Sequence, residues 1–196
     1  MKHGAQISLE RCPHCSVAKP RLDALWHQQT NDHAGHKQRQ WGAYRCATCG
    51  GVVLASSPKD AAQDITQLWP SPQSVADTVP GRARSFLEQA IASIHAPSGA
   101  VMLTASAVDA MLKEKGLKEG SLNNRIDEAA KKHLITPEMA AWAHEIRLDA
   151  NDQRHADEAA PLPTEADAQK ALEFTQALAQ FLFVLPARVE RGRKGT

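Results

Sequence analysis

Four cysteines in two pairs are the residues of this sequence with the clearest capacity for chemistry. Cys12 and Cys15 are separated by two residues, and Cys46 and Cys49 repeat that spacing. Two thiolates so spaced in a tight turn can point at one ion, and two such turns complete a tetrahedral Zn(II) site. We therefore predict one structural Zn(II), because four sulfur ligands leave no open position for a substrate.

Other states of this region stay open from the sequence. The cysteines could instead form two disulfides or remain four free thiols. His27, His33 and His36 lie between the two pairs, and any of them could replace a sulfur ligand. Because four thiolates already close the ligand shell, we expect these histidines to be loop or surface residues.

A second polar set lies in a stretch of helical periodicity. Arg147, Asn151 and His155 are spaced four apart, so on one helix they lie within roughly 80° of one another. An arginine that holds phosphate, an asparagine that orients it and a histidine that moves a proton would suffice for metal-independent cleavage of RNA. The alternative is an exposed helix face with charge pairs four residues apart.

These residues must be positioned by helices and strands, and the composition predicts that the protein is mainly α. Of 196 residues, 42% are apolar but only 5% are aromatic, and alanine is frequent in the second half. We expect a small β-type zinc ribbon over residues 1–57, whose last strand includes Val52 to Leu54, then a proline-rich linker over 58–80. Trp69 is expected to anchor that linker to the next domain.

Residues 81–196 are expected to form a bundle of about five amphipathic helices. The helices are predicted to begin after Pro80 and at the caps Ser98, Ser121, Thr136 and Thr164. The last helix should end near Leu185. The basic tail from Arg188 to Lys194 is either a frayed, solvated end or an arm that binds phosphate.

Charge and hydropathy limit the function classes. The formal net charge is +1, but residues 1–58 carry 7 basic and 3 acidic residues. A polyanion would therefore meet the N-terminal part first. No apolar run approaches the ~18 residues of a membrane span, and no secretory signal precedes the cysteines, so we expect a cytoplasmic protein without a membrane partner. The sequence has no phosphate-cradling glycine loop and no nucleophile elbow.

Several strings in the helical region together resemble the bacterial family called domain of unknown function 4145. The most recognisable family string is an arginine, a Gly-Asn three residues later and a histidine four after the asparagine. Arg147, Asn151 and His155 match it in register, with Ala150 in place of the glycine. The other matching strings are Leu122-Asn123-Asn124-Arg125-Ile126 and Phe183-Val184-Leu185-Pro186-Ala187-Arg188, and the cysteine pairs match a ribbon often found ahead of the family domain.

That family is similar to the HEPN helical bundles, many of which form dimers that cut RNA with an arginine and a histidine across a shared cleft. The resemblance implies a homodimer in a bacterial antiviral defence or toxin system. Here seven residues separate Arg147 from His155, more than is usual in HEPN nucleases. We therefore predict a non-catalytic, zinc-ribbon-containing dimeric interaction module of a defence-type or nucleic-acid-associated system, docked to a larger defence or nuclease subunit. The alternative is a metal-independent HEPN-like endoribonuclease or RNA-binding protein that uses Arg147, Asn151 and His155.

Overall fold

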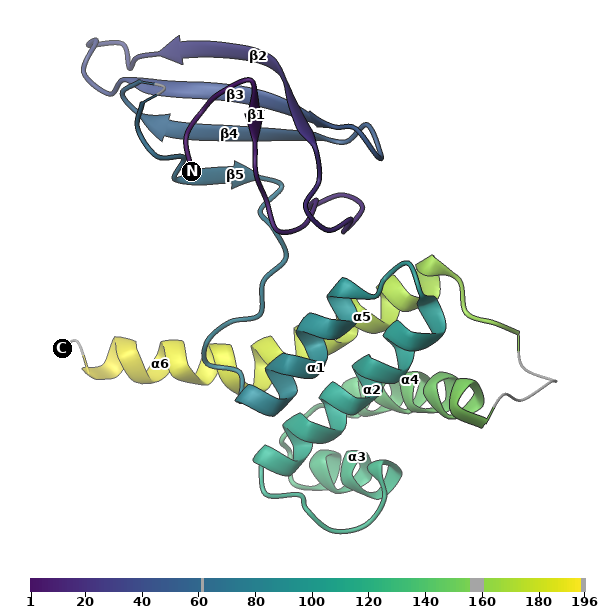
Figure 1. Ribbon diagram of the computed structural model, residues 1–196. Helices are drawn as coiled ribbons and strands as arrows, with labels where there is room; N and C mark the ends of the chain where they lie inside the picture. The colour runs from purple at the N-terminus through teal and green to yellow at the C-terminus, as the bar shows by residue number, and fades with distance from the viewer. Residues whose placement is uncertain (61, 156–160, 195–196) are drawn as a thin grey trace. The chain divides into compact units, whose positions relative to one another are not determined.

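The chain folds into two compact units, Met1–Gln73 and Ser74–Thr196, which we call the first unit and the helical unit. The computed structural model describes residues 1–60, 62–155 and 161–194, with Arg154 and His155 described by their backbone alone. The first unit is built on a sheet and the second on helices (Figure 1). The predicted order, a β-type N-terminal part followed by a helical bundle, is confirmed, but the sheet is larger than the small ribbon expected of a mainly α chain.

The sheet of the first unit is a curled antiparallel meander in which every strand pairs with its neighbour in sequence (Figure 1). Its strands, in spatial order, are β1 (Gln6–Ile7), β2 (Leu22–Thr30), β3 (Arg39–Cys46), β4 (Val52–Pro58) and β5 (Gln67–Trp69). The predicted strand after the second cysteine pair is β4.

Alternation along the strands separates a buried face from an open face. In β3, Gln40, Gly42, Tyr44 and Cys46 are buried, and Leu22 and Val53 pack beside them in the core of this unit. Directly opposed residues of antiparallel strands point to the same side of the sheet. The strand register therefore identifies which residues lie on the side opposite the buried face. This second side, the open face, carries Asp23, Trp26, Gln28 and Thr30 of β2, Arg39, Trp41, Ala43 and Arg45 of β3, Val52, Leu54, Ser56 and Pro58 of β4, and Gln67 and Trp69 of β5. All of these residues except the buried Ser56 are at least partly exposed.

The sheet extends further along the chain than the predicted zinc ribbon. Strand β5 lies inside residues 58–80, the range predicted as a linker, and pairs with β4. Trp69, predicted to anchor a linker to the next domain, instead belongs to a strand of the first unit and stacks on Trp41 with ring centroids 5.6 Å apart. The prolines at 70 and 72 obscure this short strand in the sequence.

On the buried face, the rings of Tyr44 and His3 lie close to the backbone of Gly42. A Cβ at Gly42 would lie 2.7 Å from Tyr44 Cε2 and 2.8 Å from His3 Nδ1, so no larger residue fits without displacing both rings. The hydroxyl of Tyr44 lies 3.0 Å from His3 Nδ1 and 2.8 Å from His27 Nε2. Burial, together with the neighbouring His27, lowers the pKa of His3 below its usual value. His27 thus belongs to this packing cluster.

The helical unit follows the predicted order of helices. Its elements are α1 (Gly81–Ala92), α2 (Pro97–Glu114), α3 (Leu122–Lys131), α4 (Pro137–His155), α5 (Glu165–Ala179), a π-helical turn (Gln180–Val184) and α6 (Leu185–Lys194). Helix α2 packs against α1, α3, α4 and α5. Its buried alanines allow these helices to approach closely around larger residues such as Met111, Ile126, Phe174 and Leu178.

Three of the predicted helix starts are confirmed by cap geometry. The Ser121 side chain accepts a hydrogen bond from the Asn124 N–H, and the Thr136 hydroxyl accepts one from the Met139 N–H. Thr164 and Asp167 form a reciprocal capping box at α5. Helix α2 differs, because it begins at Pro97 with Ser98 already inside its first turn.

The chain beyond Leu185 is also helical. Helix α5 continues through the π-helical turn into α6, which carries the basic residues to Lys194 and extends past the other helices (Figure 1). The tail predicted as a frayed end or an arm is therefore a regular helix with no buried residue. None of the helices among the described residues is long and apolar enough to cross a membrane.

Candidate functional site

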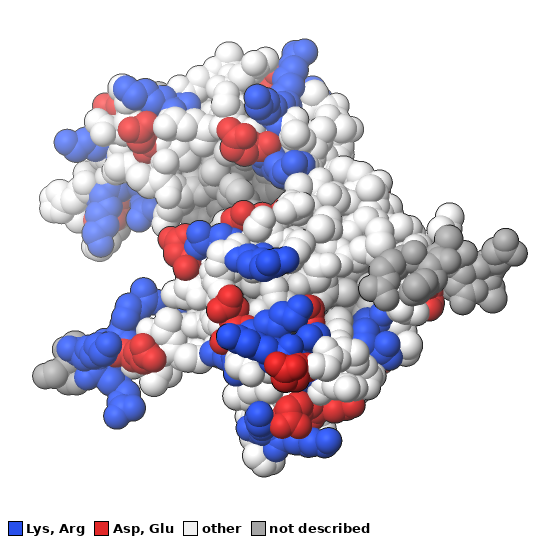
Figure 2. All heavy atoms as spheres, turned by 60° about the horizontal axis from the view of Figure 1, so that its bottom comes forward, with Lys and Arg blue, Asp and Glu red and all other residues white. Residues whose placement is uncertain are grey.

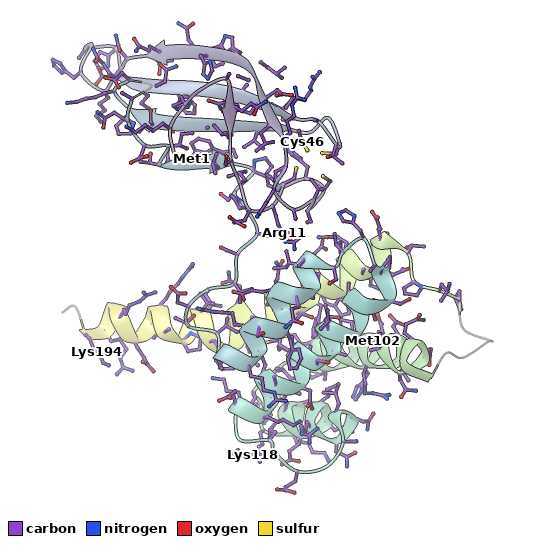
Figure 3. The ribbon with its side chains drawn as sticks, viewed as in Figure 1. Met1, Arg11, Cys46, Met102, Lys118 and Lys194 are labelled. Atoms are coloured by element: carbon purple, nitrogen blue, oxygen red, sulfur yellow. The ribbon has the colours of Figure 1, made fainter. Side chains whose placement is uncertain are left out.

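The four cysteines converge at one end of the sheet. Their sulfur atoms all lie within 4.8 Å of one another, and Cys12 Sγ is 3.9 Å from Cys49 Sγ (Figure 3). A tetrahedral ion with metal–sulfur bonds of about 2.3 Å requires sulfur atoms about 3.8 Å apart. None of the four cysteines forms a disulfide bond, so the alternative of two disulfides is not present. The donor set and its spacing fit a metal ion.

Two similar turns bring the sulfurs together. The Ser16 N–H donates to the Cys12 carbonyl at 2.9 Å, and the Gly50 N–H donates to the Cys46 carbonyl at the same distance. Ser16 and Gly50 both adopt positive φ, of 54° and 74°, which closes each turn after its second cysteine. The repeated cysteine spacing thus corresponds to a repeated backbone structure.

Backbone N–H groups point at two of the sulfurs. His14 donates to Cys12 Sγ at 3.5 Å, and Gly51 donates to Cys49 Sγ at 3.4 Å. Such bonds favour a charged thiolate over a thiol. They are therefore the contacts expected around sulfurs that serve as metal ligands.

The sulfurs also perturb one another's ionisation. Burial, with added effects of Cys49 and Cys12, raises the pKa of Cys15 to about 12. Burial also acts to raise the pKa of Cys46, but hydrogen bonds from the N–H groups of Cys49 and Thr48 and from the Cys12 and Cys49 side chains together bring that pKa to about 7. Because a metal ion binds the thiolate forms, its binding would release the remaining protons.

Histidine does not contribute to this cluster. Among the described residues, the four cysteines are the one group of three or more His, Cys, Asp and Glu residues close enough to hold a metal. His14 Nε2 instead lies 2.8 Å from the Val52 carbonyl. His33 and His36 are exposed in the loop between β2 and β3, as expected.

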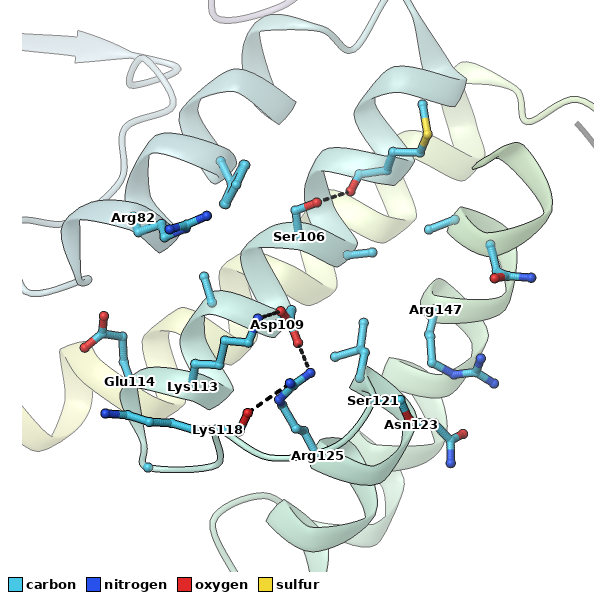
Figure 4. A pocket seen from close by; sticks show the side chains of 18 residues that line it. Arg82, Ser106, Asp109, Lys113, Glu114, Lys118, Ser121, Asn123, Arg125 and Arg147 are labelled. Carbon is cyan, nitrogen blue, oxygen red and sulfur yellow. Dashed lines mark hydrogen bonds and ion pairs between the residues drawn. The ribbon is translucent and has the colours of Figure 1, made fainter. Parts of the chain in front are cut away.

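The helical unit contains a groove of about 1230 Å³ between α1, α2, α3 and α4 (Figure 4). Its charged lining residues are Arg82, Lys113, Lys118, Arg125 and Arg147 against Asp109 and Glu114. Figure 2 shows acidic and basic side chains interspersed over the visible face, so the excess of cations in the groove is local. We call this site the cationic groove.

One carboxylate in the groove is fully engaged. Lys113 Nζ lies 2.5 Å from Asp109 Oδ2, and an Arg125 guanidinium nitrogen lies 2.7 Å from Asp109 Oδ1 (Figure 4). Arg125 also donates to the Lys118 carbonyl at 3.1 Å, although its side chain is only 10% exposed. This network is structural, and it leaves Arg82, Lys118 and Arg147 as groove cations without a salt bridge among the described residues.

The predicted set on α4 is brought together in part. Arg147 and Asn151 both line the groove, and buried Ala150 lies between them in the position of the family's glycine. The buried Nε of Arg147 has no hydrogen-bond partner among the described residues. His155 is the last residue of α4, and its side chain lies outside the described residues.

Sequence reasoning missed the role of Arg125. The residue stands between Leu122 and Ile126, on the apolar side of a helix whose other face is polar. A cation next to such a stripe is the signal that could have identified it, because a buried arginine requires an anionic partner. Asp109 could not be named as that partner from spacing alone, since it lies on a different helix.

Comparison with known proteins places the helical unit in a family. Neither the search of curated proteins nor the search of solved structures found a match. The family model described as domain of unknown function (DUF4145) matches residues 88–195, from α1 to the end of α6, which is more than half of the chain. The match includes the Arg147 string and the lining residues of the cationic groove other than Arg82 and Phe86, and it leaves out the first unit. The chain therefore belongs to the DUF4145 family.

Proposed function

We propose that this chain is a non-catalytic, dimeric interaction module of a nucleic-acid-associated system of the bacterial defence type, in which the cationic groove binds RNA. The observation that carries the proposal is the set of basic side chains that line the groove beside polar residues such as Asn123 and Asn151. Arginine recognises phosphate through several N–H groups at once. None of the described side chains that line the groove is a histidine.

The cysteine cluster supports a structural role for Zn(II) in this module. Four sulfur ligands at tetrahedral spacing suit zinc and fill its shell. The metal would then stabilise the first unit, whose core is small, and would take no part in a reaction. A larger defence or nuclease subunit would supply the chemistry.

The dimer would form through the helical unit. Phe181, Leu185 and Val189 are spaced four apart and are 41%, 46% and 60% exposed, which makes one apolar ridge along the projecting helix. An antiparallel pairing of two such ridges would give a twofold contact. Light scattering should report twice 21.3 kDa, and a mass of 21.3 kDa at micromolar concentration would contradict the dimer.

The second candidate function is a metal-independent endoribonuclease. It is favoured by the position of Arg147 and Asn151 in one groove, with His155 one turn further along the same helix. In this case His155 would remove the proton from the ribose 2′-hydroxyl, and Arg147 would stabilise the charge on phosphorus. RNA incubated with the chain and separated on a gel distinguishes the two candidates: intact RNA supports the binding module, and cleavage lost in His155→Ala supports the nuclease.

Removing groove cations should weaken RNA binding. Lys118→Gln and Arg147→Gln are each expected to raise the dissociation constant several-fold for a labelled single-stranded RNA in fluorescence anisotropy. Each should also reduce the slope of log affinity against log salt by about 0.7, the value for one lost phosphate contact on a single strand. The measurement is a salt titration of each variant beside the parent.

The matched control is Lys131→Gln, which removes an exposed lysine from the last turn of α3, outside the groove lining. It should bind RNA as the parent does. If Lys131→Gln weakens binding as much as Lys118→Gln, the attraction is a general effect of charge and the groove is not the site.

A further inference from the structure

The open face of the first unit's sheet carries three of the four tryptophans in the chain. Trp26 of β2 lies opposite Ala43, and Trp69 of β5 lies opposite Leu54, in the same row across the sheet. Trp26 is 49% and Trp69 41% exposed. Large rings are normally placed in a core, but the core of this unit lies on the other face of the sheet.

Two of the three rings on this face, those of Trp41 and Trp69, are held by contacts with their neighbours. Trp41 donates its indole N–H to the Thr30 hydroxyl at 2.9 Å. Its ring stacks on Trp69 at an interplanar angle of 29°. Ala43 and Leu54 lie between Trp26 and Trp69 in the row across the sheet, and both of these rings keep exposed surface. The face therefore offers a stacked pair of rings and a third, separate ring.

The charges around the rings are mainly positive. Arg39 and Arg45 stand at opposite ends of β3 on the same face, about 20 Å apart along the strand. Neither forms a salt bridge within the part of the chain that the structure describes. The one carboxylate at these register positions, Asp23, is already held by Arg21 at 3.0 Å and by Gln6 at 2.8 Å.

We propose that this open face binds single-stranded nucleic acid. Bases would stack on Trp26 and on the Trp41–Trp69 pair, while Arg39 and Arg45 neutralise phosphates on either side. Stacking on aromatic rings beside cations is the general mode by which proteins hold single strands without reading their sequence. A duplex could not use these rings, because its bases are already stacked. A proline-rich peptide would use the rings but not the arginines.

The test is intrinsic tryptophan fluorescence of the zinc-loaded full chain, titrated separately with oligothymidylate and oligouridylate. Bases stacked on the rings should quench the three tryptophans of the face. Trp142 provides an internal reference, because it packs against Phe174 in the helical unit at 5.0 Å and should stay unquenched. Similar affinity for the two oligonucleotides is expected, because stacking does not require a ribose hydroxyl.

Variants separate stacking from simple charge attraction. Trp26→Leu and Trp69→Leu should each weaken oligonucleotide binding at least about fivefold, the effect of one lost base stack. Leu25→Ala removes an apolar side chain that is 53% exposed on the same strand as Trp26, and it should bind as the parent does. Arg45→Gln should reduce the salt slope by about 0.7. If Trp69→Leu does not fold, Trp26→Leu and Arg45→Gln carry the test.

Three outcomes would overturn the proposal. The first is that the oligonucleotides do not quench tryptophan fluorescence. The second is that a proline-rich peptide quenches it equally. The third is that inorganic polyphosphate displaces the oligonucleotide while the tryptophan variants bind the oligonucleotide as tightly as the parent does. The site is also distinguishable from the cationic groove. Lys118→Gln and Arg147→Gln should leave the quenching unchanged, and its loss in those variants would assign binding to the groove and remove this site.

Discussion

Replacing Cys46 by Ser is expected to unfold the first unit, Met1–Gln73, and to leave the helical unit folded. Cys46 is fully buried, and its replacement removes one of the four sulfurs that would close the ligand shell of a structural zinc ion. Structural zinc contributes on the order of 10 kcal/mol to the folding of small domains. The buried core of this unit is too small to replace that contribution. We therefore expect the variant to lose the folded sheet altogether. A lower melting temperature of a sheet that still folds would be a smaller effect than the one expected.

Two measurements test the expected effect of Cys46→Ser. Elemental analysis of protein purified without chelator should give one zinc per parent chain and none per Cys46→Ser chain. Far-UV circular dichroism should retain the helical signal in both. Thr48→Ser, at an exposed position of the same turn, should keep both zinc and sheet. Less than about half an equivalent of zinc in the parent would refute the metal assignment.

Replacing Arg125 by Leu is expected to lower the free energy of unfolding of the helical unit by about 2–3 kcal/mol. The change leaves the partly buried Asp109 oxygen and the Lys118 carbonyl without their donor. Lys113 still neutralises Asp109, which keeps the expected loss below that of a fully isolated buried charge. Urea denaturation followed by circular dichroism of the helices measures it.

A surface ion pair of the same helix is the control for this prediction. Lys132→Ala breaks a contact with Glu128 at 3.2 Å in which both side chains are about half exposed. Such pairs contribute about 0.5 kcal/mol or less. If the two variants are equally stable, the Arg125 network does not stabilise the unit.

What the sequence predicts well is local. The cysteine turns, the caps at Ser121, Thr136 and Thr164 and the order of the helices all depend on residues within a few positions of one another. Short-range hydrogen bonds and helical periodicity are encoded directly in spacing. These features are therefore predictable from the amino-acid sequence alone.

What the sequence does not reveal depends on pairs of residues far apart in the chain. Strand β5 is a strand only because β4 offers it hydrogen-bonding groups, and its three residues carry too weak a pattern to be recognised. The need for Gly42 arises from His3, which lies 39 positions earlier. The cationic groove is likewise assembled from four helices, so α4 alone identified only Arg147 and Asn151.

The meander order of the sheet has a consequence for biosynthesis. Every strand pairs with its sequence neighbour, and the four cysteines of the candidate metal site all precede the helical unit. The first unit can therefore pair its strands, and could bind a metal ion at these cysteines, while the ribosome is still adding the 123 residues of the helical unit. At ordinary translation rates that interval is roughly 6–25 s. Zinc starvation during translation should thus leave chains with a folded helical unit behind an unfolded leading segment.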